Sequence, residues 1–306
     1  MNRISALIKD TKKKKELLLL AFPGLLLLFV FAYIPMFGVF IAFKDINYAK
    51  GIFGSDWVGF KNFEFFFKTG SLSRLTRNTV LLNLMFTVIG TSVSVLFAVL
   101  LYEVSRKAVK VYQTILFMPF LLSWVVASYV TDIFLNHRKG VLNILLTAIG
   151  LKSAQWYFEP SYWPFLLLIV SIWKGLGYSA IIYYTNLMGI DSTYYEAAAL
   201  DGANRFQQIT RISLPMIIPL VVLLFILSIG RIFSADFGLF YFVTRDSPMI
   251  FSATDVVDTF VYRTLRTKGD VGMSSAVAFV QSVVGCALLI TTNFIVRKIS
   301  ADKSLF

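Results

Sequence analysis

Long apolar segments recur along this sequence and determine what kind of fold it can adopt. Each reaches the roughly 20 residues that an α-helix needs to cross the hydrocarbon core of a bilayer. Only 15% of the 306 residues are charged, whereas a soluble domain has about 25%. We therefore expect an all-α, polytopic membrane protein with six transmembrane helices. The expected spans cover residues 17–43, 79–104, 112–135, 161–188, 215–242 and 273–296.

The segments outside the spans define the expected domain organisation. We expect residues 1–16 to form a basic tail, residues 17–300 the six-helix domain, and residues 301–306 a second tail. Six spans place both termini on one side of the membrane. Lysine and arginine are nearly equally numerous on the two sides, but those of the first tail are dense and adjoin the first span. The positive-inside tendency then predicts cytoplasmic termini at the plasma membrane.

The charge and the scarce reactive residues exclude several functions. The formal net charge is +12, but the basic residues flank apolar segments as membrane anchors do, so we expect no nucleic-acid partner. The single histidine, His137, leaves no partner for a histidine-based metal site or a Ser-His triad. The sequence contains no G-x-x-x-x-G-K-[ST] phosphate loop. We therefore expect no metal or other cofactor on this chain, and no ATP hydrolysis by it alone.

The segment 44–78 between the first two spans is rich in aromatic residues. Such residues among lysines and arginines suit an element that lies at the headgroup level of the membrane. The alternative is a docking face for an extracellular partner, and interface packing is the favoured interpretation. The aromatic residues concerned are Trp57, Phe60, Phe63, Phe65, Phe66 and Phe67.

A polar hairpin, residues 190–215, interrupts the apolar sequence between the fourth and fifth spans. Thr193 and Glu196 have the spacing of a capping box, so we expect a helix to begin near Thr193. Gly202 can adopt the left-handed backbone that ends a helix, and a second short helix is expected over 203–211. On this pattern alone, an ordinary amphipathic connector is an equally good interpretation.

This hairpin resembles the signature of the membrane subunits of binding-protein-dependent ABC importers. The signature is Glu-Ala-Ala, a glycine four residues after the second alanine, and Ile-x-Leu-Pro ten residues further on. The matching residues are Glu196, Ala197, Ala198, Gly202, Ile212, Leu214 and Pro215. The segments 57–63, 77–79 and 173–178 resemble the carbohydrate-uptake branch of that family, although Phe206 stands earlier in the extended motif than in some relatives. The likeness covers about residues 20–300.

The resemblance implies a role for the hairpin and a set of partners. In that family the hairpin is a coupling helix seated in a groove of an ATPase subunit, and it transmits ATP-driven closure to the pore. The implied coupling residues are Glu196, Ala197, Ala198, Asp201, Gly202 and Ala203. The implied partners are two ATPase subunits that carry ATP and Mg, a second, different permease subunit forming a heterodimer, an extracellular solute-binding protein, membrane lipid and an oligosaccharide substrate.

Polar and aromatic residues within the spans are the candidates for a substrate pathway. Ionisable side chains inside a membrane are costly and are functional candidates by default. A sugar needs aromatic rings for its apolar faces and hydrogen-bonding partners for its hydroxyls. Pairing of Arg231 with Asp236, and ordinary packing of the tyrosines, remain alternatives. The candidates are Asn83, Trp173, Lys174, Tyr178, Tyr184, Arg231, Asp236 and Gln281.

Other functions remain as alternatives. The aromatic and basic character hints at large or acidic oligosaccharides, but an ABC permease for another small polar solute is the main alternative. An ATP-independent secondary transporter would not need the hairpin. A membrane-embedded hydrolase or acyltransferase would usually need an intramembrane histidine, and His137 lies in an expected outside loop.

Overall fold

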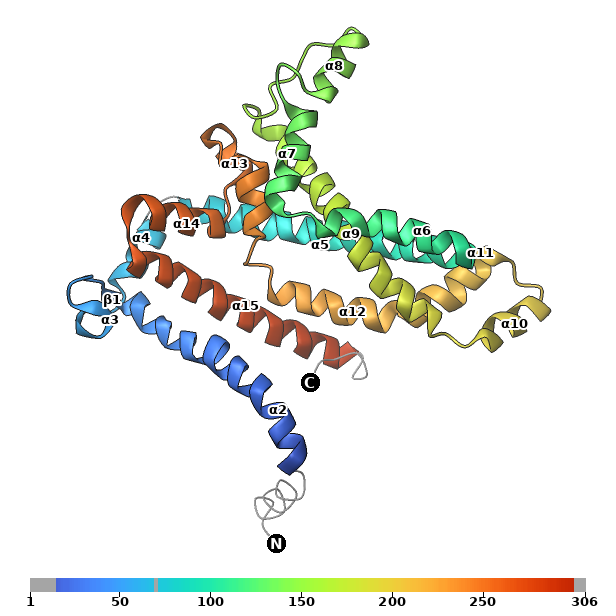
Figure 1. Cartoon of the computed structure of the whole chain (residues 1–306), viewed down its shortest axis with the longest axis horizontal. Helices are drawn as coiled ribbons and strands as arrows, with labels where there is room; N and C mark the ends of the chain where they lie inside the picture. The colour runs from blue at the N-terminus through green and yellow to red at the C-terminus, as the bar shows by residue number, and fades with distance from the viewer. Residues whose placement is uncertain (1–14, 69–70, 300–306) are drawn as a thin grey trace. The chain divides into compact units, whose positions relative to one another are not determined.

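The computed structural model describes residues 15–68 and 71–299, and most of these residues are helical (Figure 1). Within the described residues, five helices are long and apolar enough to cross a membrane, and a sixth span results if one bent helix pair is counted as one. The predicted all-α, multi-span fold is confirmed. The five spans are Leu19–Phe43, Leu72–Glu103, Pro160–Met188, Arg205–Gly230 and Val271–Lys298.

The chain divides into two compact units, which are described separately. The first comprises residues 1–68 and 269–279, and the second comprises residues 69–268 and 280–306. The predicted tails 1–16 and 301–306 lie outside the described residues, except for residues 15 and 16, with which the first helix begins.

In the first unit, one long helical run gives the predicted first span. It consists of α2 (Lys15–Leu28), a π-helical turn η1 (Phe29–Tyr33) and a 3-10 segment η2 (Ile34–Phe43). A two-stranded antiparallel pair then follows, β1 (Lys44–Asp45) and β2 (Asp56–Trp57), with the short α3 (Gly51–Gly54) between its strands. The unit also contains the amphipathic α4 (Lys61–Lys68).

The aromatic-rich segment packs on the end of that first span. The ring of Phe43 lies 5.6 Å from Trp57, 5.5 Å from Phe60, 5.3 Å from Phe63 and 5.8 Å from Phe279. Trp57 and Phe60 nevertheless remain 60% and 71% exposed. The segment therefore combines a packed ring cluster with a free aromatic surface, as an element at the membrane interface requires. The side chains of Phe65, Phe66 and Phe67 lie outside the described residues.

In the second unit, two long helices pack side by side and form its frame (Figure 1). They are α5 (Ser71–Glu103) and α9 (Trp163–Met188). With 33 residues, α5 is about 50 Å long, which exceeds the roughly 30 Å hydrocarbon core. Ala98 and Val99 of α5 pack with Tyr183 and Leu187 of α9 and with Ile217 of the fifth span, so apolar burial holds the three helices together.

The predicted third span, 112–135, is not one continuous helix but a sharply bent pair of helices. The chain forms α6 (Arg106–Phe117) and η3 (Met118–Leu121), and then α7 (Trp124–Leu135), with a bend of 101°. Pro119 favours the break because it has no N–H to donate. Ser123 then starts α7 as its N-cap, accepting from the backbone N–H of Val126 at 3.3 Å.

The predicted fifth span, 215–242, is displaced toward the N-terminus. Helix runs from Arg205 to Gly230, through a π-helical turn η5 (Ile209–Ser213) into α12 (Leu214–Gly230). Pro215 therefore lies in the first turn of α12, where a proline is tolerated, although helix already precedes it. Residues 231–236 are not helical, and residues 237–238 begin the next helical turn. The helical turn η6 (Leu239–Val243) follows.

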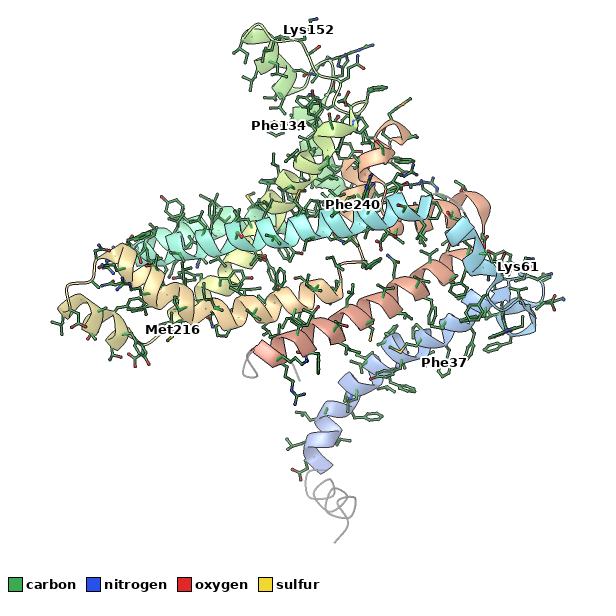
Figure 2. All side chains as sticks on the ribbon, turned by 180° about the vertical axis from the view of Figure 1, so that it is seen from behind. Phe37, Lys61, Phe134, Lys152, Met216 and Phe240 are labelled. Carbon is green, nitrogen blue, oxygen red and sulfur yellow. The ribbon has the colours of Figure 1, made fainter. Side chains whose placement is uncertain are left out.

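Short helices connect these spans and complete the second unit. The second unit has both buried and exposed apolar side chains. Phe240 is 2% exposed in the core, whereas Met216 on α12 is 43% exposed (Figure 2). The shorter elements are α8 (Val141–Ala148), η4 (Pro160–Tyr162), α10 (Ser192–Leu200), α11 (Arg205–Gln208), η7 (Pro248–Ile250), α13 (Phe251–Thr254) and α14 (Val257–Lys268). The last span is α15 (Val271–Ile299), which belongs to both units.

Candidate functional site

A cavity of about 640 Å³ lies between α5, α9, α12 and the part of α15 in the second unit. This volume is within the roughly 300–1,000 Å³ typical of small-molecule sites. Hydroxyl groups are frequent among the described residues of its wall, and Arg231 is the one charged residue among them. The hydroxyl-bearing residues are Thr87, Thr91, Ser94, Ser171, Tyr178, Ser179, Tyr183 and Ser228.

Arg231 lies directly after the last residue of α12, at its C-cap. A cation is favourable there because the C-terminal end of a helix carries a partial negative charge. Its side chain makes no hydrogen bond or ion pair with the part of the chain that the structure describes. The alternative of an Arg231–Asp236 pair is wrong, because Asp236 is used elsewhere. Arg231 therefore presents an unneutralised guanidinium group to a hydroxyl-lined cavity.

Side chains from two other helices hold the break that follows α12. Asn83 of α5 donates from Nδ2 to the carbonyl oxygens of Ile232 at 2.8 Å and Ser234 at 3.2 Å. Gln281 of α15 donates from Nε2 to the carbonyl oxygen of Phe233 at 2.7 Å. Irregular backbone at membrane depth is tolerated only where protein or water satisfies it. Asn83 and Gln281 therefore keep this segment in a fixed conformation.

Two carboxylates accept hydrogen bonds from backbone N–H groups of the segment that follows α12. The Oδ2 atom of Asp258, on α14, accepts from the Ala235 N–H at 2.7 Å. Burial raises the pKa of Asp258, and the hydrogen bonds that it accepts oppose this. Asp236 accepts from the Gly238 N–H at 2.9 Å and, with its other oxygen, from Trp124 Nε1 at 3.0 Å. Sequence analysis missed Asp258, because nothing in its local pattern indicates a distant backbone partner.

Lys174 fixes the bent α6–α7 pair to α9. Its Nζ donates to the Phe120 carbonyl oxygen at 3.0 Å and lies 5.0 Å from the Trp124 ring. Tyr178, one turn further along α9, stacks on Phe120 at 4.8 Å. α6 can approach α9 closely because Gly177 has no Cβ atom. A Cβ atom at this position would clash with the Leu116 carbonyl oxygen, at a distance of 2.1 Å.

Tyr178 and Arg231 are therefore the two predicted pathway residues that line the cavity. Tyr184 packs against the α5 core, and Trp173 is half-buried on α9. Asn83, Lys174, Asp236 and Gln281 hold the surrounding backbone and helices. Contact of any of the eight with a substrate remains a prediction.

The first helix of the hairpin begins near Thr193, as predicted, but its N-cap lies two residues earlier than the predicted one. Asp191 is the N-cap of α10, and its carboxylate accepts from the Thr193 N–H at 3.0 Å. This hydrogen bond lowers the pKa of Asp191. The predicted Thr193–Glu196 capping box is wrong, because Thr193 already lies inside the helix. A capping box does form at α11, between Asn204 and Gln207. The expected second helix, 203–211, extends without a break into the fifth span.

The predicted turn at Gly202 is confirmed. Its φ of +79° is left-handed, which a residue with a Cβ atom rarely adopts. The Ala203 N–H donates to the Ala198 oxygen at 2.9 Å, and the Gly202 N–H to the Ala199 oxygen at 3.1 Å. These two bonds make a Schellman motif, which satisfies the last carbonyl groups of α10.

The hairpin leaves its motif residues accessible. Glu196, Ala197 and Asp201 are exposed, and Ala198 and Ala203 are half-buried. Neither Glu196 nor Asp201 forms a side-chain hydrogen bond or ion pair with the described residues. The apolar side chains of Leu200 and Phe206 are 90% and 73% exposed. Such a surface is typical of an element that another protein covers.

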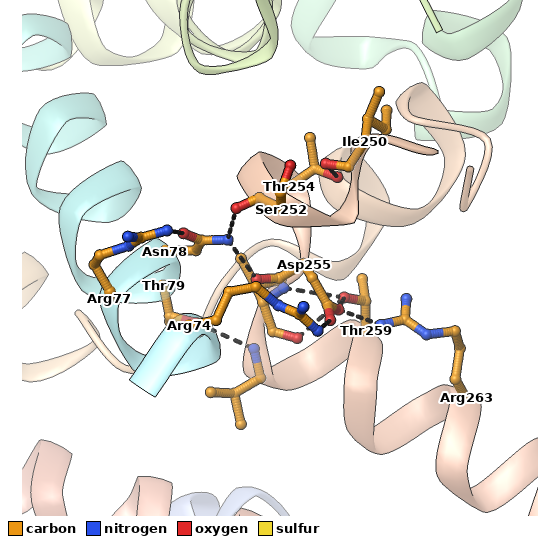
Figure 3. Close-up of polar contacts among 12 residues, drawn as sticks. Arg74, Arg77, Asn78, Thr79, Ile250, Ser252, Thr254, Asp255, Thr259 and Arg263 are labelled. Carbon is orange, nitrogen blue, oxygen red and sulfur yellow. Dashed lines mark hydrogen bonds and ion pairs between the residues drawn. The ribbon is translucent and has the colours of Figure 1, made fainter. Parts of the chain in front are cut away.

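A buried ion cluster joins the start of α5 to α13 and α14 (Figure 3). Asp255 is 2% exposed, pairs with Arg74 at 3.3 Å, and forms a second ion pair with Arg263. Asn78 donates to the carbonyl oxygens of Ser252 and Asp255, each at 3.1 Å. Burial raises the pKa of Asp255, and the two guanidinium groups oppose that shift. The cluster fixes the end of α5 that lies away from the hairpin.

Comparison with known proteins agrees with this architecture. The sequence profile of the family described as "Binding-protein-dependent transport system inner membrane component" matches residues 77–301. Protein LplB of Bacillus subtilis is 35% identical over 95% of this chain and 91% of its own length. The polygalacturonan/rhamnogalacturonan transport system permease protein YteP of the same organism is 31% identical over 95% of this chain and 90% of its own length.

A solved structure shows the same fold at comparable similarity. A chain of a bacterial alginate ABC transporter, crystallised with an alginate pentasaccharide-bound periplasmic protein, superposes with a TM-score of 0.85. It is 29% identical, and the alignment covers 95% of this chain and 97% of that one.

This chain belongs to the family of inner membrane components of binding-protein-dependent transport systems. It is a multi-pass membrane protein and the pore-forming permease subunit of an ABC transporter, rather than an enzyme.

Proposed function

We propose that this chain forms half of the translocation pathway of an ABC importer for acidic oligosaccharides. The observation that carries the proposal is the hydroxyl-lined cavity with the unpaired Arg231 in its wall. Hydroxyl groups can donate to and accept from the hydroxyls of a sugar. A guanidinium group forms strong, geometrically specific hydrogen bonds with a carboxylate. YteP and the alginate transporter are named for polysaccharides that contain such carboxylates, which supports the same substrate class.

The coupling hairpin provides the connection to ATP. In this proposal two ATPase subunits bind ATP and Mg and hold α10 by its exposed face, while this chain binds no cofactor. Glu196 and Asp201 are accessible and make no internal pair, so both are available to partner side chains. Gly202 gives the turn its shape. In this proposal the hairpin and both termini lie on the cytoplasmic side of the membrane.

The same proposal includes the remaining partners. The described cavity is open, and a second permease subunit would complete the pathway. We propose a different chain for that position, because a heterodimer allows the two halves of the pathway to differ in charge. An extracellular solute-binding protein would deliver the oligosaccharide to the end of α9 away from the hairpin.

Uptake into proteoliposomes containing the assembled importer tests the proposal. We expect Arg231→Gln to raise the KM for a loaded uronic-acid trisaccharide about tenfold, since one charge-assisted pair is lost, and to leave uptake of its carboxyl-reduced form unchanged. Arg297→Gln is the control, because Arg297 is an exposed arginine in the last turn of α15 outside the cavity. Equal uptake of both sugars by wild type and Arg231→Gln would contradict the acidic substrate. Uptake without ATP would instead indicate a secondary transporter.

A further inference from the structure

A second cavity, of about 400 Å³, lies at the opposite end of α9 from the hairpin. The 26 residues of α9 put about 39 Å of helix between these two ends. The cavity is formed by the end of α7, the loop after it, residues 155–158 and residues 245–247. Phe134 and Lys152 mark this region in Figure 2. None of its residues belongs to the central cavity.

Cationic side chains outnumber anionic ones in the described wall of this outer cavity. Arg245 pairs with Asp132 at 2.7 Å, and its guanidinium group lies 5.1 Å from the Tyr157 ring. Arg138 is exposed, and its side chain has no hydrogen bond or ion pair within the described residues. His137 adds an imidazole at the same edge. After Asp132 and Arg245 neutralise one another, Arg138 remains as an available cation.

The hydrogen-bonding and aromatic groups of the outer cavity suit a sugar ring. The second carboxylate oxygen of Asp132, Oδ1, is buried and has no hydrogen-bond partner in the described structure. A buried acceptor without a partner is costly, and a small turn of the Asp132 side chain toward the cavity would let a sugar hydroxyl supply the missing donor. Gln155 is exposed at the same wall, and the Phe158 ring is 59% exposed, so its face is free to stack on the apolar face of a sugar.

The backbone at this cavity is also unusual. Arg245 and Asp246 have φ angles of +57° and +46°. Residues other than glycine rarely adopt this conformation, and such residues cluster at binding sites and other functional positions. With this backbone conformation, the Arg245 side chain pairs with Asp132 and the Asp246 side chain pairs with Arg263 at 2.6 Å. Arg245 is thus held at the cavity by contacts on both sides of the turn.

We propose that the outer cavity binds one carboxylated sugar residue, with Arg138 on the carboxylate, Asp132 Oδ1 on a hydroxyl and Phe158 against the ring. The inference rests on the proposed function for its ligand class, but it concerns a separate site. An acidic oligosaccharide would engage this cavity at the outer end of the subunit before one of its carboxylates reaches Arg231.

Hydrogen–deuterium exchange of the assembled importer in nanodiscs tests the site directly, without transport. The probes are trigalacturonate and its carboxyl-reduced trisaccharide. We expect trigalacturonate to slow exchange in peptides from residues 130–160 and 240–250, and the neutral probe to have a much smaller effect. Arg138→Gln should raise the concentration for half-maximal protection about tenfold, because it removes one charge-assisted pair. Lys139→Gln is the matched control, since Lys139 is the exposed neighbour that does not line the cavity.

The peptides separate this inference from the proposed function. Protection only in residues 84–94 and 171–183, which line the central cavity, would overturn the outer site and leave the proposed function standing. Protection in residues 130–160 alone would support the outer site and count against the pathway at Arg231. Equal effects of Arg138→Gln and Lys139→Gln would indicate diffuse surface charge and overturn the proposal. So would protection by the binding protein without sugar that Arg138→Gln does not change, because it would identify a protein-docking surface.

Discussion

The two ends of the second unit are built in opposite ways. At the hairpin, the motif residues are exposed, the hydrogen bonds connect near neighbours, and Leu200 is almost fully accessible. At the Asp255 cluster, a buried carboxylate is held by Arg74 and Arg263, which are 181 and 8 residues away in sequence. The carboxylate of the cluster is paired within the chain, whereas Glu196 and Asp201 of the hairpin have no side-chain partner among the described residues.

This difference separates stability from coupling. A change at the Asp255 cluster should affect folding of the chain itself, because its interactions are internal. A change at the hairpin should leave the isolated chain folded and affect what the assembled transporter does. The following variants test this separation, in order of decreasing expected effect.

Asp255→Asn should destabilise the chain most. The substitution removes the counter-charge of Arg74 and one of the two carboxylates that pair with Arg263. Breaking a buried ion pair from one side costs about 3 kcal/mol. Thermal unfolding in detergent would measure the loss. Asp56→Asn is the control, because Asp56 forms an exposed ion pair with Lys50. The side chains of Asp56 and Lys50 are 78% and 52% exposed, and such a pair contributes less than about 1 kcal/mol. Similar unfolding midpoints for the two variants would show that the cluster does not stabilise the fold.

Gly202→Val should abolish transport-coupled ATP turnover while the permease remains inserted. Valine at a left-handed φ strains the turn by about 1–3 kcal/mol and misplaces the end of α10. Gly150→Val is the matched control, because Gly150 has a φ of +82° and equally open surroundings but lies at the other end of the unit. Binding-protein-stimulated ATPase activity is the measurement. Full activity of Gly202→Val, or equal losses in both variants, would contradict a coupling role for the hairpin.

Leu200→Ser should weaken association with the ATPase subunits by about tenfold, since covering an exposed leucine contributes about 1.5 kcal/mol or more. The unfolding midpoint of the isolated chain should not change, because this side chain is 90% exposed. Co-purification across a series of detergent washes, or surface binding with purified ATPase, measures the association. Leu151→Ser, at a 55% exposed leucine of the opposite end, provides the comparison. Unaltered ATPase binding would remove Leu200 from the interface.

The smallest effect is the titration of the Asp191 cap. Its pKa is lowered from 3.8 by the hydrogen bond from Thr193. A lowered pKa means that the cap contributes fully above pH 3.8 and is lost as the pH falls through the lowered value. Carbon NMR of aspartate-labelled chain, with Asp191→Asn to assign the signal, should give a midpoint below 3.8. Thr193→Pro removes the donor and should return the midpoint to the ordinary value, and a midpoint that does not move would show that this bond is not the cause.

The sequence indicates helices well where one physical signal dominates. Four spans and the Gly202 turn could be predicted because apolar length and a left-handed glycine are local properties. Pro119 marks a possible kink, but its sequence does not give the 101° bend. The end of α12 at Gly230 could not be predicted, because Arg231 and Asp236 are single charges among apolar residues that continue to Val243.

The residues of the candidate site were also only partly predictable from the sequence. Arg231 stands out in sequence as a charge among apolar residues, and the structure places it at the cavity wall. Asn83 and Gln281 stand out equally, yet they bind the backbone of residues 232–234. Polarity within a span marks a residue as important but does not distinguish contact with a solute from support of a broken backbone, because both require hydrogen-bonding groups. Asp258 and Asp255 were missed since their partners are distant in sequence.

The exposed face of the hairpin, formed by α10 and α11, has a consequence for the life of the subunit in the cell. A copy synthesised without its ATPases carries a leucine and a phenylalanine in water, at 90% and 73% exposure, and solvent-exposed apolar groups of this kind are what chaperones and proteases recognise. Under the proposed orientation that face is turned toward the cytosol. Orphan copies should then have a shorter half-life in a pulse-chase experiment than assembled ones, which would keep the subunits in balanced numbers without any control of their synthesis.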